Sequence, residues 1–498
     1  MSRQQSLAKP ASAGAPSASE MSEGRSFFGQ PWVLANLFGV EMWERFSFYG
    51  MQGILLIYLY YSTSRGGLGI DQGVAAGIVG AYGGAVYLAT ILGAWLADRV
   101  IGAERTLFAA ACVVMLGHIA LAVVPGVGGV GIGLVLIALG SGGVKANATS
   151  LVGSLYAEGD ERRDAGFSLF YMGINLGALV GPLLTGLLQK DWGFHFGFGL
   201  AAVGMAAGLV QYAVGRGRLP AETHHVPNPL ARGERGRYAG LGVVGVLLVV
   251  VLCLTHVITA GRLSDIVIWV SLAAAVVYFV VILGSPHLSH VERRRVWAMV
   301  PMFVASAVFW SLYQQQFTVM TIYSDERLDR NLFGWEMPVS WVQSINPVYI
   351  IVLAGVFAAL WTRLGERQPS TPVKFGLGTT IMGLAFLVFL PMPKGDHAVP
   401  LLGLAGILLL FTVAELLLSP VGLSLATKLA PARFKTQMVA LFFLSVALGT
   451  AMSGRLAAYY HPDHEGPFFL WVGVVAIVVG VVLLAFTKPI RALMEGVH

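Results

Sequence analysis

The feature that most constrains this chain is a cluster of three ionisable residues inside an apolar segment long enough to cross a membrane. Glu41, Glu44 and Arg45 lie within five residues of one another, and the segment around them is otherwise mostly apolar. Each charge at the centre of a bilayer costs about 2.5–3.5 kcal/mol on insertion scales, so such charges pair or face a watery cavity. At helical spacing one face of the segment consists of Glu41, Glu44, Arg45, Phe48, Tyr49 and Gln52. We therefore expect a polar stripe that faces the interior of a helical bundle.

The composition indicates that most of the surface faces something other than water. The 498-residue chain is 56% hydrophobic and 12% charged, whereas soluble domains carry about 25% charged residues. Backbone groups in lipid must be satisfied within the segment, and a helix needs ~20 apolar residues to cross. The sequence therefore predicts an all-α polytopic membrane protein with fourteen transmembrane helices. The expected spans are approximately 33–60, 74–97, 106–124, 130–153, 165–188, 196–214, 238–258, 264–284, 297–322, 339–362, 373–391, 400–426, 434–459 and 467–487.

The distribution of basic residues predicts the orientation of the chain in the membrane. With both termini in the cytoplasm, the cytoplasmic segments hold most of the 32 Lys and Arg residues. Cytoplasmic loops of membrane proteins carry this excess. The predicted location is the cytoplasmic (inner) membrane, multi-pass, with both termini cytoplasmic. Since the net charge of +6 follows from this orientation, we expect membrane lipid as a partner and no nucleic acid.

The order of the apolar segments divides the chain into two groups of six helices. The polar composition of the amino-terminal segment predicts that residues 1–28 form a disordered cytoplasmic tail. The other expected units are a six-helix bundle over 29–215, a cytoplasmic linker over 216–237, an accessory two-helix hairpin over 238–290 and a second six-helix bundle over 291–498. This order indicates the major facilitator fold, with two six-helix bundles, a two-helix insertion and a site at mid-membrane between the halves. The charged run 325–330 is expected to be a solvated loop, and ion pairs at an outer gate are the alternative.

Ionisable and polar residues fall on the helices expected to surround that central site. In this architecture the first helix of each group of three lines the cavity. The first helix carries residues 41–45, and the fourth carries Lys145. With the hairpin set aside, the seventh carries residues 313–316 and the tenth carries Glu415. Because ionisable residues inside a membrane are functional by default, these are candidate site residues.

Two sequence motifs in order resemble one known family. Residues 41–49, EMWERFSFY, match the signature ExxERFxYY with Phe48 in place of the first Tyr, and residues 167–178, FSLFYMGINLGA, match a second signature. Glu415 with SPVGLS at 419–424 matches a third pattern. These segments resemble the proton-dependent oligopeptide transporter family of the major facilitator superfamily, and the resemblance covers essentially all of the chain after the tail.

The resemblance implies a symporter that imports di- and tripeptides together with protons, and no enzyme activity, metal or other cofactor. The proton-coupling residues that it implies are Glu41, Glu44, Arg45 and Lys145. Glu415 would receive the peptide amino terminus. The predicted substrate-binding residues are Tyr49, Tyr87, Lys145, Asn175, Trp310, Tyr313, Gln314, Asn346 and Glu415. We expect the chain to function as a monomer.

The chain departs from the family pattern at two positions. Gln52 stands where many members have an Arg that helps to hold the peptide carboxylate, and Gln314 stands where many have an acidic residue able to pair with the lysine of the fourth helix. We therefore expect Lys145 to pair with Glu41 or Glu44. The departures keep open a symporter for another small anion or zwitterion, such as nitrate or an amino acid derivative. A membrane sensor that transports nothing is a separate alternative.

Overall fold

The computed structural model describes residues 26–157 and 160–496, which are mainly helical. The long helices are α1 (Val33–Tyr60), α2 (Gln72–Leu96), α3 (Ala103–Val123), α4 (Gly126–Gly153), α5 (Arg163–Trp192), α6 (Phe194–Gly215), α7 (Arg232–Leu254), α8 (Leu263–Leu283), α9 (His290–Tyr313), α11 (Ile345–Leu364), α12 (Thr371–Leu387), α13 (Leu401–Leu429), α14 (Lys435–Ala457) and α15 (Glu465–Ala485). The shorter helices are α10 (Val319–Glu326), α16 (Thr487–Leu493), the π-helical turn η3 (Ala97–Ile101), and the 3-10 helices η2 (Thr63–Arg65), η4 (Arg216–Arg218), η5 (Ala221–His224), η6 (Ala260–Arg262), η7 (Gln314–Phe317), η8 (Val339–Ser344), η9 (Gly365–Arg367) and η10 (Pro462–His464). The strands are β1 (Ser26–Phe27), β2 (Gln30–Pro31), β3 (Asn331–Leu332) and β4 (Trp335–Glu336).

The number and the apolar character of the helices confirm the predicted class. In the part of the chain that the structure describes, 12 stretches are long and apolar enough to cross a membrane. The helix α1, which contains the charged cluster, and the 17-residue apolar helix α12 complete the fourteen predicted spans. One predicted span is wrong in detail, because residues 297–322 do not form a continuous helix. There α9 ends at Tyr313, the 3-10 turn η7 follows, and the chain resumes as α10.

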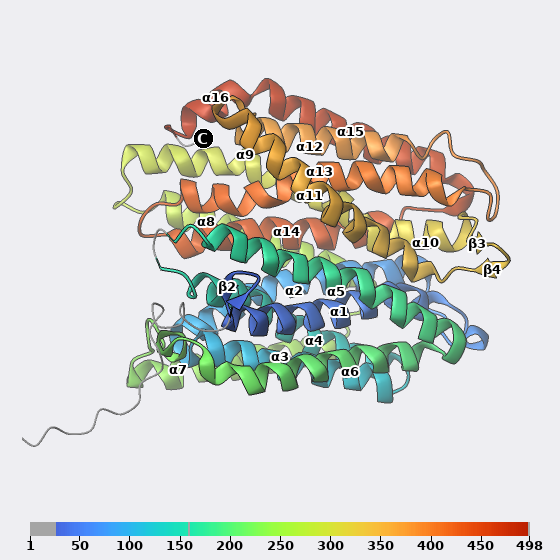
Figure 1. Ribbon diagram of the computed structural model, residues 1–498, viewed down its shortest axis with the longest axis horizontal. Helices are drawn as coiled ribbons and strands as arrows, with labels where there is room; N and C mark the ends of the chain where they lie inside the picture. Colours follow the sequence, from blue (N-terminus) through green and yellow to red (C-terminus); the bar gives the residue numbers. More distant parts are fainter. Residues whose placement is uncertain (1–25, 158–159, 497–498) are drawn as a thin grey trace, which may run out of the picture.

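The helices run side by side along the long axis of the molecule in two groups (Figure 1). We call α1–α6 the amino-terminal lobe, in which α1 packs against α5 and α6, and α4 packs against α2 and α3. We call α9–α16 the carboxy-terminal lobe, in which α12 packs against α15 and α9 against α14. The lobes meet where α2 contacts α14 and where α5 contacts α11. The segment η8 of the carboxy-terminal lobe also contacts α1 and α5.

Glycine allows a close approach between the lobes. A Cβ atom added to Gly80 of α2 would lie only 2.6 Å from the Cα atom of Gly454 of α14. One turn further along α2, a Cβ atom on Gly84 would lie 2.9 Å from the carbonyl oxygen of Ala447. Small residues at such seams let helix backbones touch, which is how helices pack strongly in lipid.

The two helices of the insertion differ from one another. The most apolar stretch of α7 has no buried residues, as expected for a helix that faces lipid. The helix α8 contacts both lobes, because it packs against α2 and α14. Ser264 of α8 donates a hydrogen bond to the carbonyl oxygen of Gly77 at 2.7 Å, and Asp265 lies 3.3 Å from Arg455. The hairpin therefore bridges the α2–α14 seam through α8.

The amino-terminal tail lies mostly outside the described residues, which begin at Ser26. Ser26 and Phe27 form β1, which pairs antiparallel with β2. The segment predicted as a disordered tail to residue 28 therefore contains ordered structure at its end. The predicted domain boundaries themselves stay predictions.

Candidate functional site

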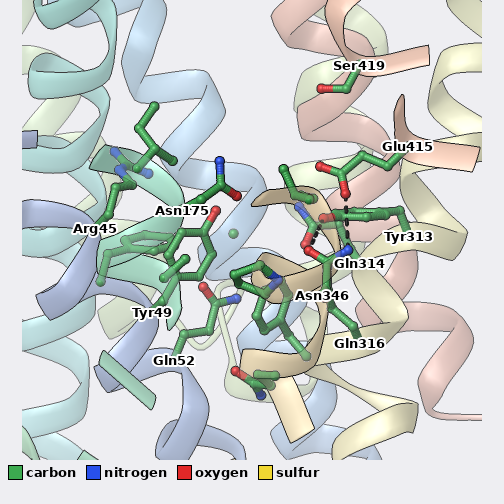
Figure 2. A pocket seen from close by; sticks show the side chains of 18 of the residues that line it. Arg45, Tyr49, Gln52, Asn175, Tyr313, Gln314, Gln316, Asn346, Glu415 and Ser419 are labelled. Carbon is green, nitrogen blue, oxygen red and sulfur yellow. Dashed lines mark hydrogen bonds between the residues drawn. The ribbon is translucent and has the colours of Figure 1, made fainter. Parts of the chain in front are cut away.

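A cavity of about 220 Å³ lies between the lobes (Figure 2). Side chains of the amino-terminal lobe, such as Arg45 and Asn175, face side chains of the carboxy-terminal lobe, such as Asn346 and Glu415. The predicted site residues that line it are Glu41, Arg45, Tyr49, Tyr87, Lys145, Asn175, Trp310, Tyr313, Gln314, Asn346 and Glu415. Every predicted site residue thus lines the cavity except Glu44.

Glu44 lies behind the cavity wall as part of a compact ion cluster. The Nε atom of Arg45 is 3.0 Å from Oε1 of Glu41 and 2.6 Å from Oε2 of Glu44. Ser141 of α4 donates a hydrogen bond to Glu44 at 2.7 Å, and the Glu44 side chain is fully buried. The predicted contact between these three ionisable residues is confirmed. Because Glu41 and Arg45 reach the cavity and Glu44 does not, a change in the charge of Glu44 would act on the cavity through Arg45.

Lys145 does not pair as predicted. Its Nζ atom lies over the Tyr87 ring, 4.3 Å from the ring centroid. Among the described residues no carboxylate oxygen lies within 4.0 Å of this nitrogen, so the predicted ion pair with Glu41 or Glu44 is wrong for this structure. The reason is that Arg45 already contacts both carboxylates. A cation over an aromatic face is partly stabilised by the ring quadrupole, and it remains available to an anion that enters the cavity.

Glu415 occupies the opposite wall on α13 and contacts only neutral donors. Asn346 Nδ2 donates to Glu415 Oε2 at 3.2 Å and to the hydroxyl of Thr412 at 3.0 Å, and the Tyr313 hydroxyl donates to Asn346 Oδ1 at 3.3 Å. Glu415 is 6% exposed, and no basic side chain in residues 26–157 and 160–496 lies within 4.0 Å of its carboxylate. The cavity therefore presents a cation from one lobe and a carboxylate from the other, neither of which has an ionic partner.

The break between α9 and α10 places several amides in the cavity. Gln314, Gln316 and Phe317 of η7 all line it. The break is stabilised locally, because Gln315 Nε2 donates to the carbonyl oxygens of Ser311 and Ser453 at 3.2 Å, and Thr318 donates to Gln315 Oε1 at 2.8 Å. Sequence reasoning missed it because glutamine is a good helix former and apolar residues flank the run.

Sequence reasoning also missed several lining residues of the cavity. Gln343 comes from η8, and its only sequence signal is an amide inside a predicted span. Tyr171 lies within the second signature motif, and Thr149 and Ser419 lie toward the far ends of their helices. Both Tyr171, 38% exposed, and Thr149 are open to solvent. The cavity therefore has access to the end of the molecule that carries Thr149.

The other end of the molecule is closed by hydrogen bonds around Asp325. The hydroxyls of Tyr60 and Tyr61, at the end of α1, donate to its two carboxylate oxygens, each at 2.7 Å. Arg330 contributes a contact at 3.4 Å, and Gln72 of α2 donates to Glu326 at 2.9 Å. Asp325 is 7% exposed, so the prediction of a solvated loop is wrong at this residue. We call this end, which carries β3 and β4 in Figure 1, the Asp325 end.

A second set of contacts between the lobes lies beside Pro182 in α5. Ser340 donates to the carbonyl oxygen of Pro182 at 2.9 Å, Trp341 Nε1 donates to that of Leu183 at 3.0 Å, and Ser344 donates to that of Leu179 at 2.8 Å. Each backbone carbonyl oxygen has two lone pairs, so it can accept a side-chain hydrogen bond in addition to the one within the helix. Side chains at η8 of the carboxy-terminal lobe use these acceptors.

No group of three or more His, Cys, Asp or Glu side chains suited to a metal ion occurs within the described ranges.

Comparison with known proteins places the chain in a family. A family model described as the POT family matches residues 104–465. The chain is 43% identical to the uncharacterized transporter YclF of Bacillus subtilis (strain 168), over 95% of this chain and 97% of that one. It is 38% identical to the di-/tripeptide transporter of Lactococcus lactis subsp. cremoris, over 95% and 98%. A crystal structure of a mutant peptide transporter POT in complex with alafosfalin matches with a TM-score of 0.91 at 44% identity, over 96% and 99%. The chain therefore belongs to the POT family, the proton-dependent oligopeptide transporters that its motifs resemble.

Proposed function

We propose that this chain is a proton-coupled symporter that imports di- and tripeptides across the cytoplasmic membrane by alternating access. The observation that carries the proposal is a pair of opposite charges without ionic partners, Lys145 in one lobe and Glu415 in the other. Relatives named as peptide transporters support the substrate class. The chain belongs with transporters and not with enzymes.

A small peptide is a zwitterion whose charged ends lie roughly 5–10 Å apart when it is extended. In our proposal the ammonium group binds Glu415, and the carboxylate binds Lys145. Asn175 and Asn346 also line the cavity, and the amide oxygen of each has lone-pair capacity to accept a hydrogen bond from the peptide N–H. This arrangement holds the parts that all peptides share and leaves the side chains free to vary. It would hold each peptide against both lobes at once.

Proton coupling would use the ion cluster on α1. Protonation of Glu41 or Glu44 would leave Arg45 with one carboxylate instead of two, so that Arg45 could turn toward the substrate carboxylate beside Lys145. The proton and the peptide must then favour the same state, and each must improve the binding of the other. A membrane potential adds about 2.3 kcal/mol per charge for every 100 mV.

The state of the structure fits an inward-facing step of this cycle. The Asp325 end is closed and the Thr149 end is accessible. The excess of basic residues in the loops at the Thr149 end supports its assignment to the cytoplasm. We propose that both termini lie on that side.

The direct test is uptake of labelled dialanine into proteoliposomes with an imposed pH gradient. We expect dialanine to accumulate against its own gradient only when the proton gradient is present. Unlabelled tripeptide should compete, whereas nitrate and free amino acids should not. Competition by nitrate or an amino acid derivative alone would favour the alternative substrates, and binding without uptake would favour a sensor.

Replacing Glu415 by Gln should weaken the apparent affinity for dialanine about 10–100-fold. A hydrogen bond to a charged group contributes about 1.5–3 kcal/mol, and each 1.4 kcal/mol is a factor of about ten in affinity. The measurement is the concentration of dialanine that half-saturates uptake. The exposed Glu161→Gln serves as the control. An unchanged half-saturating concentration in Glu415→Gln would contradict the proposed role of this carboxylate.

A further inference from the structure

Two amide side chains from opposite lobes lie at the end of the cavity nearest to Asp325. Gln52 is the lining residue of α1 that is closest in sequence to the Tyr60 end of that helix. Gln343 comes from η8 and bonds to Thr321, four residues before Asp325. Gln52 is 4% exposed and Gln343 is 8% exposed. With Phe317 these residues form what we call the floor of the cavity.

The hydrogen bonds of Thr321 determine how the Gln343 amide is oriented. The Thr321 hydroxyl donates to the carbonyl oxygen of Gln316 at 3.1 Å, so it can only accept from Gln343, whose Nε2 lies 3.2 Å away. Oxygen and nitrogen of an amide are assigned from such networks. The Oε1 atom of Gln343 is thereby directed toward α1, where it lies 3.4 Å from the position of a Cβ atom on Gly53. It is buried, and no donor in the described chain reaches it.

Gln52 is adjacent to Gly53 and has no side-chain hydrogen bond to any described residue. Its Oε1 atom is buried without a donor, and Figure 2 shows its amide group directed toward the middle of the cavity. The floor thus holds two buried acceptor oxygens without donors, one on each glutamine, and the Gln52 amide nitrogen donates to no described residue. An amide has the same combination of donor and acceptor groups.

The floor carries no charge. The acidic and basic lining residues are Glu41, Arg45, Lys145 and Glu415, and the carboxylate of Glu41 already contacts Arg45. A charged group buried beside neutral amides would lose its hydration without gaining a counterion, whereas an amide group would exchange hydrogen bonds with water for hydrogen bonds with the floor.

We propose that Gln52 and Gln343 form a subsite that selects an uncharged amide group of the substrate over a carboxylate or an ester. The inference rests on the proposed peptide transport and specifies one of its subsites. The amide has two possible sources: the side chain of an Asn or Gln residue in a dipeptide, or the second peptide bond of a tripeptide. Specificity of this kind is strong because an analogue that lacks the donor leaves a buried acceptor unpaired.

The test is competition against uptake of labelled dialanine by the full chain in proteoliposomes. Three matched pairs of competitors are compared: Ala-Gln with Ala-Glu, Gln-Ala with Glu-Ala, and trialanine with the analogue in which an ester oxygen replaces the second amide nitrogen. The quantity measured is the ratio of half-inhibitory concentrations within each pair. This ratio does not depend on the overall activity of a variant.

For the wild-type chain we expect a ratio of at least fivefold in favour of the amide in one or more pairs. Gln343→Leu and Gln52→Leu should each lower that ratio below twofold, whereas Gln368→Leu, at an exposed position outside the cavity, should retain it. The pair that responds identifies the source of the amide. If a Leu variant shows no thermal unfolding transition and is therefore misfolded, the corresponding Asn variant, Gln343→Asn or Gln52→Asn, is measured instead.

Two results would overturn the subsite: a ratio below fivefold in all three pairs for the wild-type chain, or a ratio of at least twofold that persists in variants of both glutamines. Either result leaves dialanine uptake intact, so the proposed function would stand. Absence of dialanine uptake by the wild-type chain would instead overturn the proposed function and the subsite together.

Discussion

Arg45 contacts two carboxylates, at 3.0 Å from Glu41 and 2.6 Å from Glu44, and only 2% of its side chain is exposed. Removing one partner of a buried ion pair is costly, because the remaining charge stays desolvated. A cation with two partners can lose one and still keep a counterion. This arrangement lets one carboxylate take up a proton without leaving Arg45 unpaired. Proton coupling requires a carboxylate that can change its charge in this way.

Glu44→Gln should abolish proton-driven accumulation of dialanine while exchange across the membrane remains measurable. The amide cannot take up a proton, and Arg45 would still contact Glu41. We expect accumulation against a gradient to fall at least tenfold and counterflow to change less than threefold, with the exposed Glu222→Gln as a control. Continued accumulation by Glu44→Gln would show that this residue does not couple transport to protons.

The sequence could predict which residues meet at the site but not how they pair. Helical spacing put Glu41, Glu44 and Arg45 together, and the family resemblance identified lining residues in both lobes but missed others such as Tyr171 and Gln343. Sequence alone cannot decide whether Glu41 and Glu44 pair with Arg45 or with Lys145, because both cations lie in the amino-terminal lobe. The distance between a residue on α1 and one on α4 depends on packing in three dimensions.

At the scale of single elements, the seam between α2 and α14 depends on glycine. The Cβ atom absent from Gly80 would lie 2.6 Å from the Gly454 Cα atom, whereas one on Gly77, a turn earlier, would meet only Ser264 Oγ at 3.5 Å. The two positions lie on the same helix and differ mainly in what they touch. Substitutions at these two positions therefore form a matched pair for measuring how much the α2–α14 seam contributes to the stability of the protein.

Gly80→Ala should lower the thermal unfolding midpoint of the purified protein, and Gly77→Ala should leave it unchanged or raise it. Alanine favours a helix interior over glycine by about 1 kcal/mol at both positions. At Gly80 this gain is opposed by overpacking, which costs about 1–3 kcal/mol. Equal midpoints for the two variants would contradict the close packing of these helices.

Helix boundaries were the part of the elements that sequence patterns predicted least well. Apolar length predicted fourteen spans, since a bilayer requires about 20 residues whatever the fold. The break at Gln314–Phe317 was not predicted. The hydrogen bond from Gln315 to the carbonyl oxygen of Ser453 in α14 stabilises it, and the sequence pattern of α9 alone cannot reveal that contact. Contacts between segments far apart in the sequence decide such breaks.

At the scale of the whole molecule, the two lobes are closed on each other at one end and accessible at the other. Asp325 is the centre of the closed end, because it accepts bonds from two adjacent tyrosines of the opposite lobe. Its burial was not predictable from a run of charges that also suits a solvated loop. The tyrosine partners lie more than 260 residues away in the sequence.

Asp325→Ala should expose the cavity from the side of the Asp325 end. Each hydrogen bond to a charged group contributes about 1.5–3 kcal/mol, so losing two should shift the population of the closed state more than tenfold. The measurement is the rate at which an impermeant thiol reagent, added at that side, labels Ala178→Cys in a chain that also carries Cys112→Ser and Cys253→Ser. The exposed neighbour Asp329→Ala is the control, and an equal rate in both would contradict closure by Asp325.

The short helix α10 gives this closed end a mechanical connection to the cavity. It begins two residues after Phe317, whose ring stacks on Tyr49 with centroids 6.0 Å apart, and it ends one residue after Asp325. Eight residues at 1.5 Å each make a stiff rod of about 12 Å. Tilting such a rod by about 10° about its inner end displaces its tip by roughly 2 Å, enough to separate Asp325 from both tyrosine hydroxyls. α10 therefore links the Phe317–Tyr49 stack beside the cavity to the two tyrosine hydrogen bonds at the Asp325 end.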